Sequence, residues 1–349
     1  MKILPLTEKK EFKRFKRFRR ALYRNDPHYV STAEFTLDML LYRENGFAAS
    51  LEICPVMGVE GKRTLLEALL IHNPKDSYLQ IAFFEALENI PEEVRVFMDY
   101  AADYAKKRGL HRIVIGLNGH LSYGVGLSVD MKRPNTFDST YTKPYYNSYF
   151  EGYRKHGLVA FSSTPDDILP HLSAIKSDIT VRKIDLDRFE EETELFRRIC
   201  DETIGTTFLY TETDKGHFYS LLKDMTFFLK PENILFAEHK GEVVGFLFWH
   251  PDYNEILKKG RQNSLFTIAA RYLLRKGRIK RAKLNAMGVK RAYRGVATAR
   301  LLYEASRYLS SYEVIETNFV WENNKSSMAL NRYVMKNEER HFAVYEVEV

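Results

Sequence analysis

The sequence predicts a mixed α/β (α+β) fold, in which helices pack on a mixed sheet, arranged as two similar lobes. Segments with strand and helix patterns alternate along the chain, which is typical of helices that share a sheet. The order of these segments occurs twice, and 349 residues suit two domains of ordinary size. We therefore expect one lobe over residues 1–170 and a second over residues 178–349, with the break near residues 165–177.

The first half opens with an amphipathic helix over residues 9–24. Its apolar side chains recur at helical spacing between Lys and Arg residues: Phe12, Phe15, Phe18 and Leu22. We expect Thr7 to cap this helix, and its apolar stripe to pack on the core rather than on a membrane. Three strands, a helix and a fourth strand follow at residues 50–57, 67–72, 78–87, 91–108 and 112–116.

The second half repeats this order with one insertion. Its expected strands lie at residues 180–185, 233–239, 242–249, 284–289, 314–321 and 341–348. Its expected helices lie at residues 186–200, 215–222, 296–309 and 325–335, with a basic helical insertion near residues 265–275.

Composition and motif searches exclude several classes of protein. No apolar run approaches the roughly 18 residues of a membrane span and no signal peptide is recognisable, so we expect a cytoplasmic protein. Cys54 and Cys200 stand far apart and no HxxxH or HExxH spacing occurs, so we expect neither a disulfide framework nor a metal site. A GxSxG elbow and a Walker loop are also missing, and we interpret the glycines within residues 116–126 as a structural turn.

Positive charge is concentrated in residues 258–300. This stretch holds fourteen Lys or Arg and no Asp or Glu, although the whole chain carries only +7, so the remainder is net acidic. A block of one sign repels itself unless it is solvated or faces an anion. The stretch therefore predicts either a solvated face or a contact with a phosphate-bearing ligand, an acidic protein, nucleic acid or an anionic membrane.

A strand, loop and helix unit within this stretch carries the clearest indication of chemistry. Gly295, Ala297 and Ala299 place small residues where the helix begins, which lets a ligand approach the backbone. The free N–H groups and the positive dipole end of a helix N-terminus suit a phosphate. Arg291 and Arg294 add mobile positive charge beside it.

This unit resembles motif A of the GNAT (Gcn5-related N-acetyltransferase) superfamily, whose [Gln/Arg]-x-x-Gly-x-[Gly/Ala] loop cradles the pyrophosphate of acyl-CoA. The match is Arg294-x-x-Ala297-x-Ala299, with Ala where the family usually has its first Gly. The resemblance implies that acetyl-CoA or another acyl-CoA is held by Met287, Gly288, Val289, Arg291, Arg294, Gly295, Val296, Ala297, Thr298 and Ala299.

The segment from Trp321-Glu-Asn-Asn324 to Tyr333 resembles motif B of the same superfamily, and we count Asn324 with the site. The resemblance implies a general acid that protonates the leaving thiolate. We assign that role to Tyr333, although its distance from Asn324 is two residues longer than the family's usual spacing. A backbone N–H within residues 287–289 would stabilise the oxyanion. For the general base the sequence offers Glu322, His250 and Asp252.

The first half is similar to the longer bacterial proteins that carry two GNAT-like lobes as a pseudo-dimer. The similarity rests on Leu22-Tyr-Arg-Asn-Asp-Pro27, Phe83-Phe-Glu85 and Pro144-Tyr-Tyr-Asn147, and on Pro251-Asp-Tyr-Asn254 in the second half. Where motif A should occur, this lobe has Glu92 and Glu93, whose carboxylates would repel a pyrophosphate. We therefore expect the first lobe to be degenerate and the acyl-CoA site to lie in the second.

The resemblance implies an N-acyltransferase, with acetyl transfer expected, in which an amine attacks the thioester directly within a ternary complex. One alternative is a transferase of similar fold that uses acyl carrier protein or aminoacyl-tRNA as its donor. Another is an inactive binding module for an anionic partner. Residues 258–300 would bind acyl carrier protein or an anionic membrane surface, and we expect no binding of nucleic acid because no stacking motif is recognisable.

Overall fold

The computed structural model describes residues 1–30, 33–130, 133–168, 176–223, 225–259, 264–335 and 338–349. The strands of the first half are β1 (Lys2–Pro5), β2 (Glu52–Glu60), β3 (Arg63–His72), β4 (Leu79–Ala86), β5 (Arg112–Ile115), β6 (Leu127–Ser128) and β7 (Arg154–Ser163). Its helices are α1 (Lys9–Tyr23), α2 (Ala33–Tyr42), α3 (Gly46–Ser50), α4 (Pro91–Lys106), α5 (Tyr146–Tyr149) and α6 (Pro165–Ile168).

The second half contains the elements expected from its sequence, except that the strand expected over residues 314–321 is interrupted at residues 318–319. Its strands are β8 (Ile179–Lys183), β9 (Ile234–His239), β10 (Glu242–Pro251), β11 (Arg281–Val289), β12 (Val314–Thr317), β13 (Val320–Trp321) and β14 (Glu338–Glu348). Its helices are α7 (Phe189–Ile204), α8 (Lys215–Lys223), α9 (Leu265–Arg275), α10 (Val296–Leu309) and α11 (Lys325–Val334).

All of these strands belong to one sheet, which confirms the mixed α/β prediction. Its order is β1-β2-β3-β4-β5-β14-β7-β12-β11-β10-β9-β8, with β6 beside β14 and β13 beside β7. The pairs β4–β5 and β11–β12 are parallel, whereas every other pair is antiparallel. Each half therefore contributes one parallel pair. In both halves the two parallel strands separate beyond their last paired residues.

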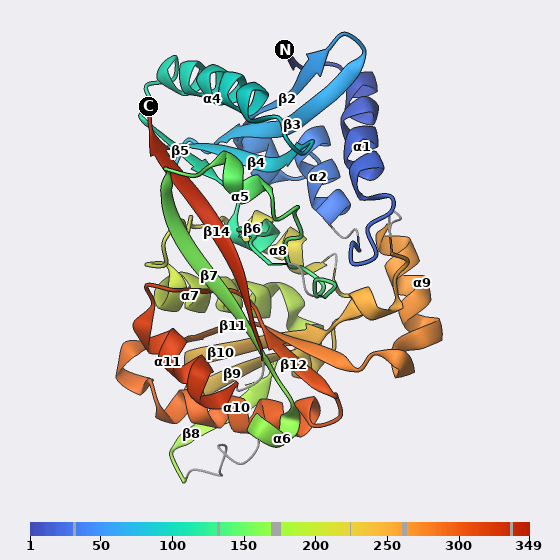
Figure 1. The fold of residues 1–349 in the computed structure, drawn as a ribbon. Helices are drawn as coiled ribbons and strands as arrows, with labels where there is room; N and C mark the ends of the chain where they lie inside the picture. Colours follow the sequence, from blue (N-terminus) through green and yellow to red (C-terminus); the bar gives the residue numbers. More distant parts are fainter. Residues whose placement is uncertain (31–32, 131–132, 169–175, 224, 260–263, 336–337) are drawn as a thin grey trace.

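Two long strands join the halves at the middle of the sheet (Figure 1). The last strand of the chain, β14, pairs with β5 on one side and with β7 on the other. Strand β7 also pairs with β12 and β13. The sequence analysis did not predict β7. The division at residues 170 and 178 stays a prediction, and residues 169–175 of the expected break lie outside the described residues.

The amphipathic helix α1 packs on the core as predicted. Phe15 is fully buried and Phe12 is nearly so, within an apolar cluster that also contains α2 and the strands β2 to β4. The predicted cap was wrong by one residue: Glu8, not Thr7, is the N-cap, and it forms a capping box with Glu11. The backbone N–H groups of Thr7 and Glu8 both donate to the Glu11 carboxylate, at 3.0 and 2.9 Å, which explains the shift.

Two buried histidines lie where the halves meet. His120 of the first half accepts a hydrogen bond from Ser122 N–H through Nδ1 and donates through Nε2 to the carbonyl of Thr211, so it is neutral. His217 of the second half contacts the hydroxyl of Tyr123 and stacks on Phe47, with ring centroids 4.0 Å apart. Burial lowers the pKa of His120 to about 4 and that of His217 to about 3.

We expect acid to destabilise the protein through these two residues. A histidine whose pKa falls on folding binds its proton more readily in the unfolded chain, so stability is lost as the pH falls below the unfolded value of about 6.5. Each such imidazole removes about 1.4 kcal/mol per pH unit over that interval. Urea unfolding at pH 7, 6 and 5 measures the slope. The variant His217→Gln should be less stable at pH 7 but show a flatter slope; equal slopes would contradict the assignment.

Candidate functional site

The parallel strands β11 and β12 separate halfway along β11. They pair from Arg281 and Val314 as far as Leu284 and Thr317, and the N–H of Asn318 then donates to the carbonyl of Leu284 at 2.7 Å. Beyond that point, residues 286–289 pair with β10 only. A β-bulge leaves Asn285 without a partner in β10. The bulge redirects the Asn285 side chain at the place where β11 and β12 separate. The backbone edge of β11 from 285 to 289 is thus open on the β12 side.

Helix α10 begins beside this open edge. Its N-cap, Gly295, has φ 93° and ψ −73°, a conformation that favours glycine, and it offers no side chain to accept from the N–H groups of the first turn. Arg294 precedes it and is exposed. The methyl of Ala297 is fully buried in the core of the second half, so the departure from the motif at this position adds no bulk at the helix start. An uncapped helix N-terminus with an adjacent arginine suits a phosphate.

A cavity of about 840 Å³ occupies the opening and is lined by both halves of the chain. Of the predicted cofactor contacts, seven line it: Met287, Gly288, Val289, Arg294, Gly295, Thr298 and Ala299. Three are not in its wall: Arg291, Val296 and Ala297. Gly288 also serves packing, because a Cβ there would stand 2.1 Å from the Thr203 hydroxyl oxygen of α7.

A loop of the first half is fixed against the second half at this cavity. The carboxylate of Asp252 accepts from the N–H of Phe137 at 2.7 Å, and the Asn254 amide donates to the carbonyl of Asn135 at 2.9 Å. The ammonium of Lys283, fully buried on β11, donates to the carbonyls of Phe137 and Asp138 at 3.1 and 2.9 Å. These contacts hold the loop at the point where β11 and β12 separate.

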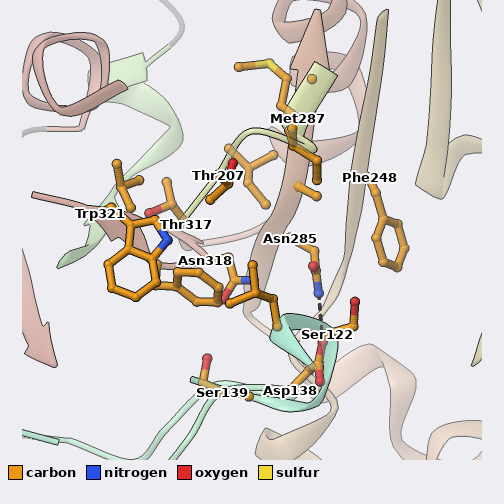
Figure 2. A pocket seen from close by; sticks show the side chains of 18 of the residues that line it. Ser122, Asp138, Ser139, Thr207, Phe248, Asn285, Met287, Thr317, Asn318 and Trp321 are labelled. Atoms are coloured by element: carbon orange, nitrogen blue, oxygen red, sulfur yellow. Dashed lines mark hydrogen bonds between the residues drawn. The ribbon is translucent and has the colours of Figure 1, made fainter. Parts of the chain in front are cut away.

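The loop presents Asp138 to the cavity. Figure 2 shows the Asn285 amide directed at its carboxylate, to which it donates a hydrogen bond of 3.0 Å. Asp138 has φ 62°, which is rare for a residue other than glycine and marks a backbone held in place by its surroundings. Its side chain is enclosed by protein yet exposed to the cavity, and burial raises the pKa of this carboxyl, although Lys283 opposes that effect.

The residues predicted from motif B fall into two groups. Tyr333 and Asn324 line the cavity. Tyr333 is 63% exposed near the end of α11, whereas Asn324 is the N-cap of α11 and accepts from the N–H of Ser327 at 3.2 Å. Glu322 does not line the cavity: its carboxylate lies over Gly157 of β7 and 3.9 Å from His341. Of the motif B candidates, Tyr333 and Asn324 therefore belong to the cavity wall and Glu322 does not.

The other two predicted bases lie behind the cavity wall. The Nδ1 of His250 donates to the carbonyl of Pro251 at 2.9 Å, and its Nε2 lies 3.3 Å from the amide nitrogen of Asn285. Burial, aided by Lys283, lowers the pKa of His250 to about 3, so it is neutral and orients Asn285. Burial raises the pKa of Asp252 to about 7, and this residue anchors the Asp138 loop. Neither residue lines the cavity.

The sequence analysis missed Asp138, Lys283 and Asn285. The sequence did contain a signal for the latter two. Residues 283 and 285 are both polar and stand two positions apart in a predicted strand region, so their side chains are expected on the same face. Asp138 carried no such signal: it lies in a loop outside any motif, and its position depends on second-half residues more than 100 positions later.

The first half has a matching opening that its own chain closes. Strands β4 and β5 pair as far as Ile81 and Ile115, and the N–H of Gly116 donates to the carbonyl of Ile81 at 3.2 Å. The side chain of Tyr146 then donates to Glu85 at 2.7 Å and accepts from the N–H of Ala86 at 3.1 Å. The hydroxyl of Tyr149 accepts from the N–H of Ile90, at the start of α4, at 3.4 Å. Backbone groups that are open in the second half are therefore occupied here.

One side of the cavity is an apolar wall built by α7, α8, the segment that follows α8, and β10. Its members are large aliphatic and aromatic side chains: Phe196, Phe218, Leu221, Leu222, Met225, Phe228 and Phe248. They extend from the neighbourhood of Asn285 into the space between the halves. Such a wall offers no charged partner, so it suits the hydrocarbon part of a ligand.

No family model matches the chain. It is 23% identical over 374 aligned positions to a Caulobacter vibrioides protein named bacterial ceramide synthase, and the match covers 99% of this chain and 97% of that protein. The fold is similar to that of a tandem GNAT protein from the clavulanic acid biosynthesis pathway, with a TM-score of 0.57, 12% identity and coverage of 99% and 98% of the two chains.

A probable N-acyltransferase from Enterococcus faecalis V583 has a similar fold, with a TM-score of 0.54, 9% identity, and coverage of 100% of this chain and 72% of that one. These similarities span both halves of the chain. The protein therefore has the tandem GNAT fold, as the sequence motifs predicted.

Proposed function

We propose that this tandem GNAT protein is an N-acyltransferase that moves the acyl group of an acyl-CoA onto the amino group of a long-chain amine. The observation that carries the proposal is a single cavity in which three features converge. These are the open edge of β11 with the uncapped start of α10, the carboxylate of Asp138, and the apolar wall.

The donor fits the second-half opening. The first-turn N–H groups of α10 and Arg294 would bind the pyrophosphate of an acyl-CoA. The open backbone edge at residues 287–289 would bind the chain that leads to the thioester, and one of its N–H groups would stabilise the oxyanion. The counterpart in the first half is closed by Tyr146 and Tyr149, and Glu92 and Glu93 stand at the start of α4, which supports a single donor site.

Asp138 replaces the sequence-predicted bases in this proposal. Its carboxylate would attract the acceptor's ammonium group and take one proton from it. The neutral amine then attacks the thioester carbonyl, so a C–N bond forms as the C–S bond breaks. The amide nitrogen loses its second proton to water, and the thiolate of CoA takes a proton from Tyr333. Asn285 and Lys283 act through Asp138 by holding its carboxylate and its loop.

The assignment of Tyr333 as the acid predicts a loss of chemistry without a loss of binding. We expect Tyr333→Phe to lower kcat by about 10²-fold, the lower end for a general acid, with KM for acyl-CoA little changed. Steady-state assays of CoA thiol release measure both constants. Tyr303→Phe is the matched control, because Tyr303 lies on α10 outside the cavity wall. An unchanged kcat in Tyr333→Phe would assign this residue to packing.

The acceptor class rests on the apolar wall and on the named relative. A ceramide is a sphingoid base, a long-chain amino alcohol, that carries an acyl chain in amide linkage. Such a base would place its amino group at Asp138 and its hydrocarbon chain along Phe196, Phe228 and Phe248. A short hydrophilic amine would leave this wall in contact with water, which is unfavourable.

The test is an acceptor and donor survey with the purified protein. Sphinganine, a long-chain primary amine, spermidine and a lysine peptide are each offered with acyl-CoA thioesters from acetyl to stearoyl, and the amide product is identified by mass spectrometry. We expect the long-chain amines to exceed the short ones in kcat/KM by at least about 100-fold, consistent with burial of a long apolar chain. Acylation of spermidine or the peptide alone would refute the acceptor class. No CoA release with any pair, despite acyl-CoA binding, would favour the inactive binding module.

A further inference from the structure

Helix α9 has two apolar faces, only one of which is covered. Ile268 and Tyr272 are 1% and 8% exposed and pack in a cluster with Phe228 and Tyr253. On the opposite side of the same helix, Phe266, Leu273 and Leu274 are 84%, 73% and 83% exposed. Positions 266, 273 and 274 lie together because seven or eight residues make two turns. This outward group is apolar although the helix belongs to the basic stretch, and we call it the apolar ridge.

Helix α9, which carries the apolar ridge, lies at the outer edge of the molecule (Figure 1), and three basic residues directly follow the ridge in the sequence. Arg275, Lys276 and Arg278 are exposed, and none of them forms an ion pair with any of the described residues. Other members of the basic stretch are used differently: Lys283 is buried, and Lys280 pairs with Glu313 at 2.6 Å. Arg261 lies outside the described residues. Three exposed cations of the stretch that form no ion pair with the described residues thus directly follow the apolar ridge in the chain.

We propose that the apolar ridge and the three cations beside it dock this protein on the surface of an anionic lipid bilayer. Helices that lie in a membrane interface combine large apolar side chains on one face with Lys and Arg at the boundary. Side chains that project outward suit a fluid bilayer, which accepts them without a complementary pocket. The anionic headgroups would meet Arg275, Lys276 and Arg278. None of the described helices is long and apolar enough to cross a membrane, so this contact would be peripheral.

The docking surface lies next to the cavity. Ile268 and Tyr272, on the covered face of α9, share their apolar cluster with Phe137 and Phe228. Both phenylalanines also line the cavity, and Phe137 directly precedes Asp138. The apolar cluster beneath α9 therefore reaches the cavity wall. A bilayer amphiphile would have a short path to the cavity, although the docking itself does not depend on the proposed reaction.

The test is co-sedimentation of the full chain with phosphatidylcholine vesicles that contain phosphatidylglycerol or lack it. We expect binding to the anionic vesicles at low salt, a fall of at least tenfold in affinity at moderate salt, and weak binding to phosphatidylcholine alone. The triple variant Phe266→Ser, Leu273→Ser, Leu274→Ser should bind anionic vesicles with an affinity at least tenfold lower than that of the wild type. The variant Arg275→Ser, Lys276→Ser, Arg278→Ser should lose the dependence on anionic lipid. In Leu273→Trp, indole fluorescence should shift to the blue on vesicles.

A control variant with the same change in charge is available on the other basic helix. Lys9→Ser, Lys13→Ser, Arg17→Ser removes three exposed cations from α1, whose large apolar side chains are covered, and it should bind vesicles like the wild type. Thermal melting confirms that each variant is folded. The proposal is overturned if the wild type does not bind anionic vesicles at low salt. It is also overturned if the α1 variant loses as much affinity for these vesicles as the α9 variants lose. It is equally overturned if the α9 changes abolish binding to acyl carrier protein or self-association while vesicle binding persists.

Discussion

Replacement of Asp138 by Asn is expected to lower kcat by about 10³-fold, within the range for loss of a general base, while the affinity for acyl-CoA stays unchanged. Asn is nearly isosteric, tolerates the positive φ of this position, and keeps an oxygen that can accept from Asn285. Only the capacity to take a proton and to attract an ammonium group is removed. Single-turnover assays separate this chemical effect from product release.

A pH profile distinguishes a proton acceptor from a residue that only shapes the loop. In the wild type, kcat/KM should fall as the pH drops below the raised pKa of Asp138, because the protonated carboxyl cannot act as a base. The acid limb due to this group should be missing in Asp138→Asn. Glu322→Gln is the control, since that carboxylate lies over β7 outside the cavity. A loss in Glu322→Gln equal to that in Asp138→Asn would restore the sequence-predicted base.

The contrast between these two carboxylates shows what sequence can predict about the site. The phosphate-binding part was predictable because it is local: a strand, a tight loop and a helix start lie within 16 residues of one another. Seven of the ten residues predicted there do line the cavity. The proposed base was not predictable, because Asp138 and its loop are held at the site by contacts with Asp252, Lys283 and Asn285 of the other half.

The same distinction applies to the fold. Strands with neighbours close in sequence, such as β9 with β10, were predicted within a few residues of their observed ends. Strand β7 was missed, although its sequence Arg154–Ser163 contains a continuous apolar run. Its partners β12 and β14 come from the other half of the chain. The sequence next to β7 therefore contains neither a hairpin turn nor a helix crossover that would predict the strand. The joining of the halves at β7 and β14 is therefore a property that only the structure shows.

Reversal of charge at Arg294 is expected to remove acyl-CoA binding. In Arg294→Glu a carboxylate replaces the guanidinium that precedes the uncapped N-terminus of α10, where a pyrophosphate would lie. The new charge repels the ligand and competes for the free N–H groups of the first turn. We expect the Kd for CoA to rise at least about 100-fold, equivalent to some 2.7 kcal/mol. Isothermal titration with CoA measures it without requiring catalysis.

The first half supplies the matched control for this change. Glu92→Ala and Glu93→Ala alter charge at the equivalent helix start of α4, where backbone groups already bond to Tyr146 and Tyr149. These variants should bind CoA with the wild-type affinity and with one equivalent per chain. If the Glu92 and Glu93 variants weakened binding as much as Arg294→Glu, or if a second equivalent bound, the single-site proposal would fail. Because Arg294 lies on the surface, its reversal should shift Tm little, so lost binding cannot be attributed to lost folding.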